Sequence, residues 1–184
     1  DIWYMEQSDL YLLENRSYAR MQQVEVTDNT TSWHRFGSER DQPLDKLDVI
    51  LMRKDPPFDM EYVYTTYILE QAEQHGTLVV NRPCSLRDAN EKLFTAWFPQ
   101  CCTSSLVSRD HQHLTKFLKK QEDIILKPLD GMGGTSIFRV RQDDPNSNVI
   151  IETLTENGSK YAMAQRYLPE ISAGDKRILM VDGE

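Results

Sequence analysis

The feature that most constrains the fold of this chain is a glycine-rich loop between two stretches that are typical of β-strands. The first stretch ends in Lys127-Pro128, the second begins at Ser136, and three glycines fall within four positions between them. Glycine reaches positive φ without strain, and successive N–H groups in such a loop can form a concave nest for phosphate oxygens. A glycine cluster alone more commonly marks a hairpin turn, but connections this long, entered through Lys-Pro, are unusual for hairpins. The stretch therefore predicts a phosphate-binding loop, with Lys127 adding a positive charge.

The order of the residues separates this loop from two commoner phosphate-binding motifs. In the Walker pattern a Lys-Ser/Thr pair follows the glycines and opens a helix, and the dinucleotide fingerprint also opens a helix. Here the lysine precedes the glycines, and residues 136–140 are β-branched, aromatic and alternating, which predicts a strand. Strand, lysine, glycine-rich loop and strand, in that order, resemble the arrangement of ATP-grasp enzymes.

Composition limits the remaining possibilities. The 184 residues suffice for one domain or two small ones, and 39% hydrophobic with 27% charged residues is ordinary for a globular protein. No apolar run approaches the roughly 20 residues of a membrane helix. A net charge of -8 disfavours a nucleic-acid backbone as the main partner. Cys84, Cys101 and Cys102 lack disulfide or zinc spacing and indicate reduced thiols, so we expect a cytoplasmic protein without a nucleic-acid or membrane partner.

The first half of the chain predicts an α/β domain. Residues 1–26 have a β-type pattern, and residues 27–43 are polar and predict a loop. A strand over 47–52, a helix from Asp59 to Gly76 and a strand over 77–80 predict a parallel unit. Ligands tend to lie beyond the carboxyl ends of such strands, which places the loop 53–59 at a site edge. We expect the core face of the helix to be its apolar stripe, formed by Met60, Val63, Tyr64, Tyr67 and Ile68.

The second half predicts a short helix over 90–98, a strand over 105–107, a helix over 110–120, a helix over 146–155, a strand over 161–167 and a last strand from Asp175. Lys92 would lie in the first turn of the short helix, where the helix dipole disfavours a cation. That placement indicates a ligand role, although a lysine that points to solvent beside Glu91 is the simpler interpretation. The chain starts at Asp1 on a strand-like run and ends at an Asp-Gly turn, so we expect a fragment truncated at both ends.

Four motifs together resemble the bacterial glutathione synthetase family, an ATP-grasp family, along almost the whole chain. Each motif is moderately specific, and their occurrence in the family's order is more so. They are Arg53-Lys54-Asp55-Pro56-Pro57-Phe58-Asp59, Asn90-Glu91-Lys92-Leu93-Phe94-Thr95-Ala96-Trp97-Phe98, Ile125-Leu126-Lys127-Pro128-Leu129-Asp130-Gly131-Met132-Gly133-Gly134 and Gly174-Asp175-Lys176-Arg177. The resemblance implies a Rossmann-like pre-ATP-grasp domain over 1–88, missing its start, and an incomplete ATP-grasp domain over 89–184. It also implies a ligase that joins γ-glutamylcysteine to glycine through an acyl phosphate.

The resemblance carries roles onto matching residues. It implies that Lys92 and Lys127 hold ATP phosphates, that Arg177 is a catalytic cation facing substrate or phosphate, and that Arg53 and Asp55 lie at the dipeptide edge. The loop, adenine and ribose contacts would come from Gly131, Met132, Gly133, Gly134, Gln165, Tyr167, Leu168 and Asp175. The family also implies Mg²⁺, with metal ligands expected beyond residue 184 and none within this chain, and a homotetramer.

Because half of the nucleotide cleft would be missing, we expect the 184-residue piece to be inactive and the full-length protein to be the enzyme. Three alternatives stay open at this point. One is an ATP-grasp ligase for another carboxylate and amine, the second is a nucleotide-binding module without catalysis, and the third is a purely structural α/β domain.

Overall fold

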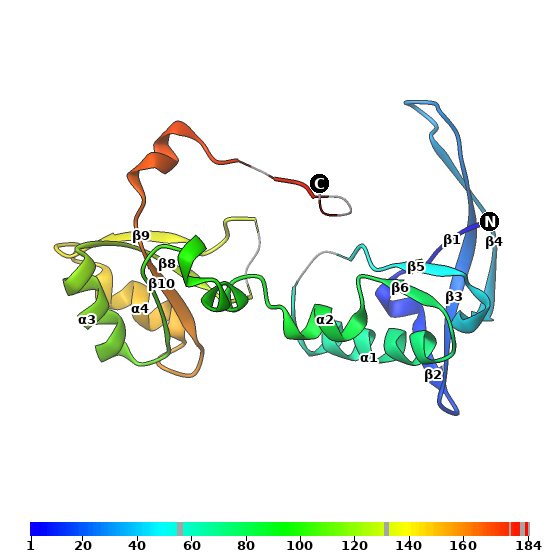
Figure 1. Ribbon diagram of the computed structural model, residues 1–184, viewed down its shortest axis with the longest axis horizontal. Coiled ribbons are helices and arrows are strands. Elements are labelled where there is room, and N and C mark those ends of the chain that lie inside the picture. Colours follow the sequence, from blue (N-terminus) through cyan, green and yellow to red (C-terminus); the bar gives the residue numbers. More distant parts are fainter. Residues whose placement is uncertain (55–56, 131–132, 177, 181–182, 184) are drawn as a thin grey trace. The chain divides into compact units, whose positions relative to one another are not determined.

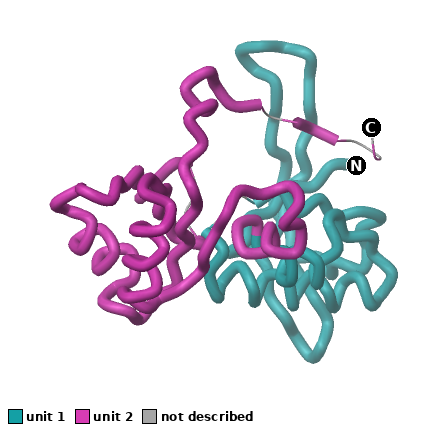
Figure 2. The backbone as a smooth tube through the Cα atoms, turned by 60° about the vertical axis from the view of Figure 1, so that its left-hand side comes forward, with its two compact units in different colours: residues 1–90 teal, residues 91–184 magenta. Residues whose placement is uncertain are grey.

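The computed structural model describes residues 1–54, 57–130, 133–176, 178–180 and 183. Contacts within the chain divide it into two compact units, residues 1–90 and residues 91–184 (Figure 2). Each unit has a hydrophobic core of its own.

Unit 1 begins with a four-stranded antiparallel sheet in which β3 pairs with the three other strands. The strands are β1 (Ile2–Tyr4), β2 (Leu10–Leu13), β3 (Arg16–Val26) and β4 (His34–Pro43), and the short 3-10 helix η1 (Gln7–Asp9) precedes β2. The β-type pattern of residues 1–26 is confirmed. The loop predicted for 27–43 is wrong over β4, whose side chains are mostly exposed, so pairing with β3 rather than an apolar pattern holds it in the sheet.

The second part of unit 1 is the predicted strand–helix–strand unit. After the 3-10 helix η2 (Leu44–Lys46) come β5 (Val49–Leu51), α1 (Met60–Gln74), β6 (Leu78–Val80) and α2 (Pro83–Asp88). β5 and β6 pair in parallel, with Ile50 opposite Val79. The Asp59 carboxylate accepts a hydrogen bond from the Tyr62 backbone N–H at 2.9 Å, which confirms Asp59 as the cap of α1.

The apolar stripe predicted as the core face of α1 is wrong at three of its five residues, whereas Ile68 packs against the core of unit 1. Met60, Tyr64 and Tyr67 are 56%, 51% and 52% exposed, whereas the buried face holds Leu69, Ala72 and polar neighbours. Thr65 and Thr66 can be buried because each hydroxyl donates to a backbone carbonyl of the preceding turn, at 2.9 and 2.6 Å. The core of unit 1 is formed by Ala19, Met21, Leu44, Ile50, Leu69, Ala72 and Val79.

Unit 2 is an antiparallel sheet of strand order β7-β10-β8-β9, with helices α3 and α4 on one face (Figure 1). Its elements are β7 (Ser105–Ser108), α3 (His111–Gln121), β8 (Asp123–Pro128), β9 (Phe138–Arg141), α4 (Ser147–Thr155) and β10 (Ala162–Arg166). All six predicted elements are present, within a few residues of the expected bounds. Their core is formed by Leu114, Leu118, Ile124, Leu126, Val140, Ile151, Leu154, Ala162 and Ala164.

Two predictions for unit 2 are wrong. The helix expected over 90–98 is instead two 3-10 turns, η3 (Leu93–Trp97) and η4 (Pro99–Cys101), so Lys92 precedes the first turn rather than lying within it. Pro99 disfavours helical backbone at the residue before it, and Phe98, with φ of -125° and ψ of 57°, lies outside the helical region, so a longer helix stops there. After β10 comes the 3-10 helix η5 (Pro169–Ala173), and the described residues 174–176 and 178–180 form no strand because they pair with no neighbouring strand.

Candidate nucleotide site

β8 positions Lys127 on the sheet face that the helices do not cover. Side chains alternate along a strand, and Ile124 and Leu126 are 0% exposed against α3 and α4. Lys127 therefore points to the opposite face. The pairing with β10 places Met163 opposite Lys127 and Gln165 opposite Ile125, so these side chains share that face.

Lys92 lies at the point where the chain leaves β8. Its side chain is only 13% exposed, so the simpler interpretation of a solvent-facing lysine does not hold. Its ammonium donates to Glu91 Oε1 at 2.9 Å and to the backbone carbonyl of Leu129 at 3.4 Å. Leu129 directly follows β8, so the second contact ties Lys92 to the entry of the glycine-rich loop.

The two lysines are close enough to influence each other electrostatically. Burial lowers the pKa of Lys127 below its ordinary value, and the positive charge of Lys92 lowers that pKa further. The Glu91 carboxylate and Cys102 act in the opposite direction but do not cancel the shift. Two ammonium groups that repel each other in a partly buried place are stabilised by an anion, which is the electrostatic requirement of a phosphate site.

The glycine-rich loop has the backbone conformation that its sequence predicts at the two glycines that the structure describes. Gly133 and Gly134 have φ of 66° and 78°, values that side-chain-bearing residues rarely adopt. A Cβ at either position would meet no atom within 4 Å, so the requirement for glycine comes from the backbone and not from crowding. Gly131 and Met132, also predicted to cover phosphate, lie outside the described residues.

The predicted adenine contacts lie where β10 ends. Tyr167 follows the last residue of β10, and its backbone N–H donates to the Asp123 carbonyl at 3.0 Å. Leu168 comes next and is 45% exposed. Asp175 lies after η5 and is exposed, and Arg177 lies outside the described residues.

One cluster of unit 2 was not predicted from the sequence. The Arg139 guanidinium lies 3.6 Å from the centroid of the Tyr167 ring and binds the Asp123 carboxylate through Nε at 3.0 Å and Nη2 at 2.6 Å. This pairing lowers the pKa of Asp123. The alternation of residues 136–140 could have indicated that Arg139 and Lys127 share a sheet face, but the partner strand could not be read from it.

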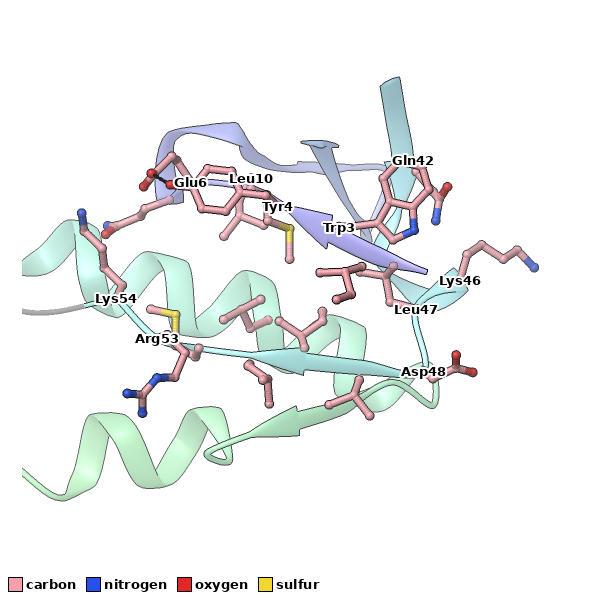
Figure 3. A pocket seen from close by; sticks show the side chains of 18 of the residues that line it. Trp3, Tyr4, Glu6, Leu10, Gln42, Lys46, Leu47, Asp48, Arg53 and Lys54 are labelled. Carbon is pink, nitrogen blue, oxygen red and sulfur yellow. Dashed lines mark hydrogen bonds between the residues drawn. The ribbon is translucent and has the colours of Figure 1, made fainter. Parts of the chain in front are cut away.

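Unit 1 holds a separate hollow of about 940 Å³ between β1 and β5 (Figure 3). Arg53, predicted at the dipeptide edge, lies with Lys54 at one end of this hollow, and Lys46 and Asp48 lie at the other. Trp3 and Tyr4 line it from β1. Asp55, the second residue predicted at that edge, lies outside the described residues.

Among the residues that the structure describes, no three His, Cys, Asp or Glu side chains group closely enough to hold a metal ion. Across the same residues, every helix is too short or too polar to cross a bilayer.

Two family models match the chain. The model described as the prokaryotic glutathione synthetase ATP-grasp domain matches residues 91–184, and the model of the N-terminal domain of the same family matches residues 1–87. A glutathione synthetase of Yersinia pestis is 61% identical over 184 residues, and one of Pseudomonas putida is 61% identical over 183 residues. Both matches cover 100% of this chain and 58% of the relative, so the chain spans somewhat more than half the length of these relatives.

Two solved structures of synthetases share the fold at low sequence identity. A D-cycloserine synthetase has a TM-score of 0.53 and 16% identity, covering 70% of this chain and 46% of its own. D-alanyl-alanine synthetase A of Vibrio cholerae has a TM-score of 0.52 and 13% identity, covering 86% of this chain and 48% of its own. The N-terminal α/β and ATP-grasp fold class predicted from the sequence is confirmed.

Proposed function

This chain belongs to the prokaryotic glutathione synthetase family, and we propose that the full-length protein is an ATP-dependent ligase that joins γ-glutamylcysteine to glycine. Residues 1–88 would form the N-terminal domain and residues 89–184 the first part of the ATP-grasp domain. The observation that carries the proposal is the pair of partly buried ammonium groups, Lys92 and Lys127, at the entry of a glycine-rich loop. The identity to glutathione synthetases then supports this substrate set over others.

The reaction proceeds in two balanced steps. The cysteinyl carboxylate of the dipeptide attacks the γ-phosphorus of ATP, which forms an acyl phosphate and releases ADP. The glycine amine then attacks the acyl carbon, an amide bond forms, and inorganic phosphate leaves. Such chemistry asks the protein mainly to position the reactants and to stabilise charge.

The described residues can position the phosphates and stabilise their charge. Lys92 and Lys127 would hold the phosphates, because an ammonium ~4 Å from a phosphate oxygen contributes about 4 kcal/mol at an effective dielectric near 20, before desolvation is counted. Gly133 and Gly134 give the loop the positive φ that lets successive N–H groups face an anion. Water excluded by this loop cannot hydrolyse the acyl phosphate.

The adenine would lie on the sheet face that Lys127 shares with Gln165, beside the backbone of Tyr167 and Leu168, with Asp175 at the ribose. Gly131, Met132 and Arg177 would complete the phosphate contacts, and Arg53 and Asp55 would contact the dipeptide. Mg²⁺ would neutralise phosphate charge when bound. Among the described residues, no three His, Cys, Asp or Glu side chains group to hold it, and its ligands are expected beyond residue 184.

The test is an ADP-release assay on the full-length protein with ATP, γ-glutamylcysteine and glycine. We expect release that requires both amino-acid substrates, and a loss of turnover in Lys127→Met. Lys120→Met is the matched control because Lys120 lies exposed in the last turn of α3, which covers the face of the sheet opposite Lys127. Equal turnover in both variants would remove the assigned role of Lys127.

The same assay separates the alternatives. Faster turnover with a different acid or amine would favour another carboxylate–amine ligase. A rise in melting temperature with ATP but no turnover would favour a nucleotide-binding module, and no rise at ATP well above an expected Kd would favour a structural domain. We expect residues 1–184 alone to release no ADP, and turnover by this piece would contradict that expectation.

Cytoplasmic location and assembly as a homotetramer complete the proposal. Both rest on family resemblance. Light scattering on the full-length protein tests the assembly, and a monomeric mass at working concentrations would contradict it.

A further inference from the structure

The ion pair at the start of β8 connects two strands to the segment that follows β10. Arg139 stands opposite Ile125 in the β8–β9 pairing, so its side chain reaches Asp123 diagonally across the two strands. The guanidinium donates through Nε and Nη2 to both carboxylate oxygens. A planar guanidinium held in this fork has little freedom to rotate.

The same guanidinium fixes the ring of Tyr167. Its central carbon lies 3.6 Å from the ring centroid, within the range of a cation–π contact. The backbone N–H of Tyr167 donates to the carbonyl of Asp123 at 3.0 Å. The backbone of Tyr167 therefore contacts Asp123 directly, and its side chain contacts Asp123 indirectly, through Arg139.

We propose that Asp123 and Arg139 are positioning residues that hold the backbone of Tyr167 and Leu168 in register with β8, and that the preference for adenine depends on them. This rests on the proposed function, in which that backbone reads the edge of the purine. Leu168 is exposed and the chain turns into η5 directly after it. The regular pairing of β10 with β8 ends at Arg166. The contacts of Tyr167 therefore fix the position of the backbone that follows β10, at Tyr167 and Leu168.

A neighbouring arginine supplies a matched control. Arg141 also lies on β9, and its Nε is 3.8 Å from the same Asp123 carboxylate. Its side chain is 65% exposed, against 39% for Arg139. Of these two described arginines, Arg139 is the one that contacts the Tyr167 ring. Arg139→Met and Arg141→Met therefore each remove one positive charge beside Asp123 but differ in their effect on Tyr167.

The experiment measures steady-state kinetics of the full-length enzyme with ATP and with GTP. For Arg139→Met we expect KM for ATP to rise about three- to tenfold, equivalent to weakening one backbone hydrogen bond to the base. The ratio of kcat/KM for ATP over GTP should fall, and KM for glycine should stay within twofold. Arg139→Lys keeps the charge but lacks the planar fork, so it should recover only part of the ATP preference.

Three outcomes would overturn the proposal. The first is a KM for ATP in Arg139→Met no higher than in Arg141→Met. The second is an equal fall in kcat/KM for both nucleotides, which would show a general structural effect. The third is complete recovery by Arg139→Lys, since charge alone would then suffice. An unmodified protein that turns over ATP with the dipeptide and glycine upholds the proposed function in all three cases, so the two proposals fail separately.

Discussion

Lys127 should stabilise the bound nucleotide and destabilise the free protein, and the variant Lys127→Met separates the two effects. In the free protein, burial and the charge of Lys92 both disfavour the Lys127 ammonium, as its lowered pKa shows. Methionine fills similar space opposite Met163 and carries no charge. Replacing a residue that serves function at a cost to stability commonly gains about 0.5–2 kcal/mol. We therefore expect the melting temperature without nucleotide to rise by a few degrees, at about 2–4 °C per kcal/mol for a domain of 150–250 residues.

With ATP the advantage of Lys127→Met should shrink or reverse, because the variant gains less stability from the nucleotide. A ligand at 100 times its Kd stabilises the native state by about 2.7 kcal/mol. The loss of a charged contact to phosphate costs about 1.5–3 kcal/mol, or roughly a 10- to 100-fold weaker Kd. At the same ATP concentration the variant would then gain only about 0.4–1.4 kcal/mol.

Differential scanning fluorimetry of the full-length protein, with and without ATP, measures both effects, and Lys120→Met should change neither. A melting temperature of Lys127→Met below that of the unmodified protein without ATP would refute the reasoning. So would an ATP-induced rise in melting temperature as large as that of the unmodified protein.

The pH dependence of stability gives a further test of the charge on Lys127. A lysine whose folded-state pKa is lowered binds fewer protons when folded, so its destabilising effect is complete below that pKa and disappears as pH rises towards 10.5, the ordinary value. The advantage of Lys127→Met should therefore shrink over that window.

Three further predictions concern the scaffold. Leu126→Ala removes a side chain that is 0% exposed in the core of unit 2, and we expect a loss of about 2–5 kcal/mol, measured by urea unfolding, with a smaller loss for Leu126→Met. Asp59→Ala removes the cap of α1 and should cost about 0.5–2 kcal/mol, whereas Asp59→Asn should be nearly neutral; equal losses would contradict the capping role. Because Arg139 lowers the pKa of Asp123, this pairing stabilises the protein above pH 3.8, the ordinary carboxyl value, and is lost as pH falls through the lowered pKa. Melting temperatures between pH 3 and 6 should therefore fall less steeply for Asp123→Asn than for the unmodified protein, and parallel curves would contradict the assignment.

The elements predicted correctly share strong local signals. The strand before the glycine-rich loop has an apolar run, and the strand after it alternates between apolar and charged side chains. α1 has a capping aspartate, and Gly133 and Gly134 adopt the positive φ that such a loop requires. Each of these signals is local in the sequence. Fold class and the position of Lys127 could be predicted for that reason.

The errors arise where pairing or packing overrides local pattern. β4 is polar on both faces and is a strand only because β3 lies beside it. α1 has two candidate faces, and the sheet covers the one that contains Thr65 and Thr66, since their hydroxyls find partners within the helix. The cluster of Asp123, Arg139 and Tyr167 joins three separate segments, and its contacts depend on a strand order that no local pattern specifies.

The two faces of β8 have different roles in unit 2. Leu126 packs in the apolar core, and the next side chain, Lys127, lies on the opposite face, which carries the charged groups. Inserting a single amino acid between them would shift one part of β8 by one position, so that either the Lys127 side chain turns inward among leucines or the Leu126 side chain turns outward. Folding and activity would then be lost together. In a random insertion library of the complete gene, active variants should consequently be depleted for insertions between the codons of Leu126 and Lys127.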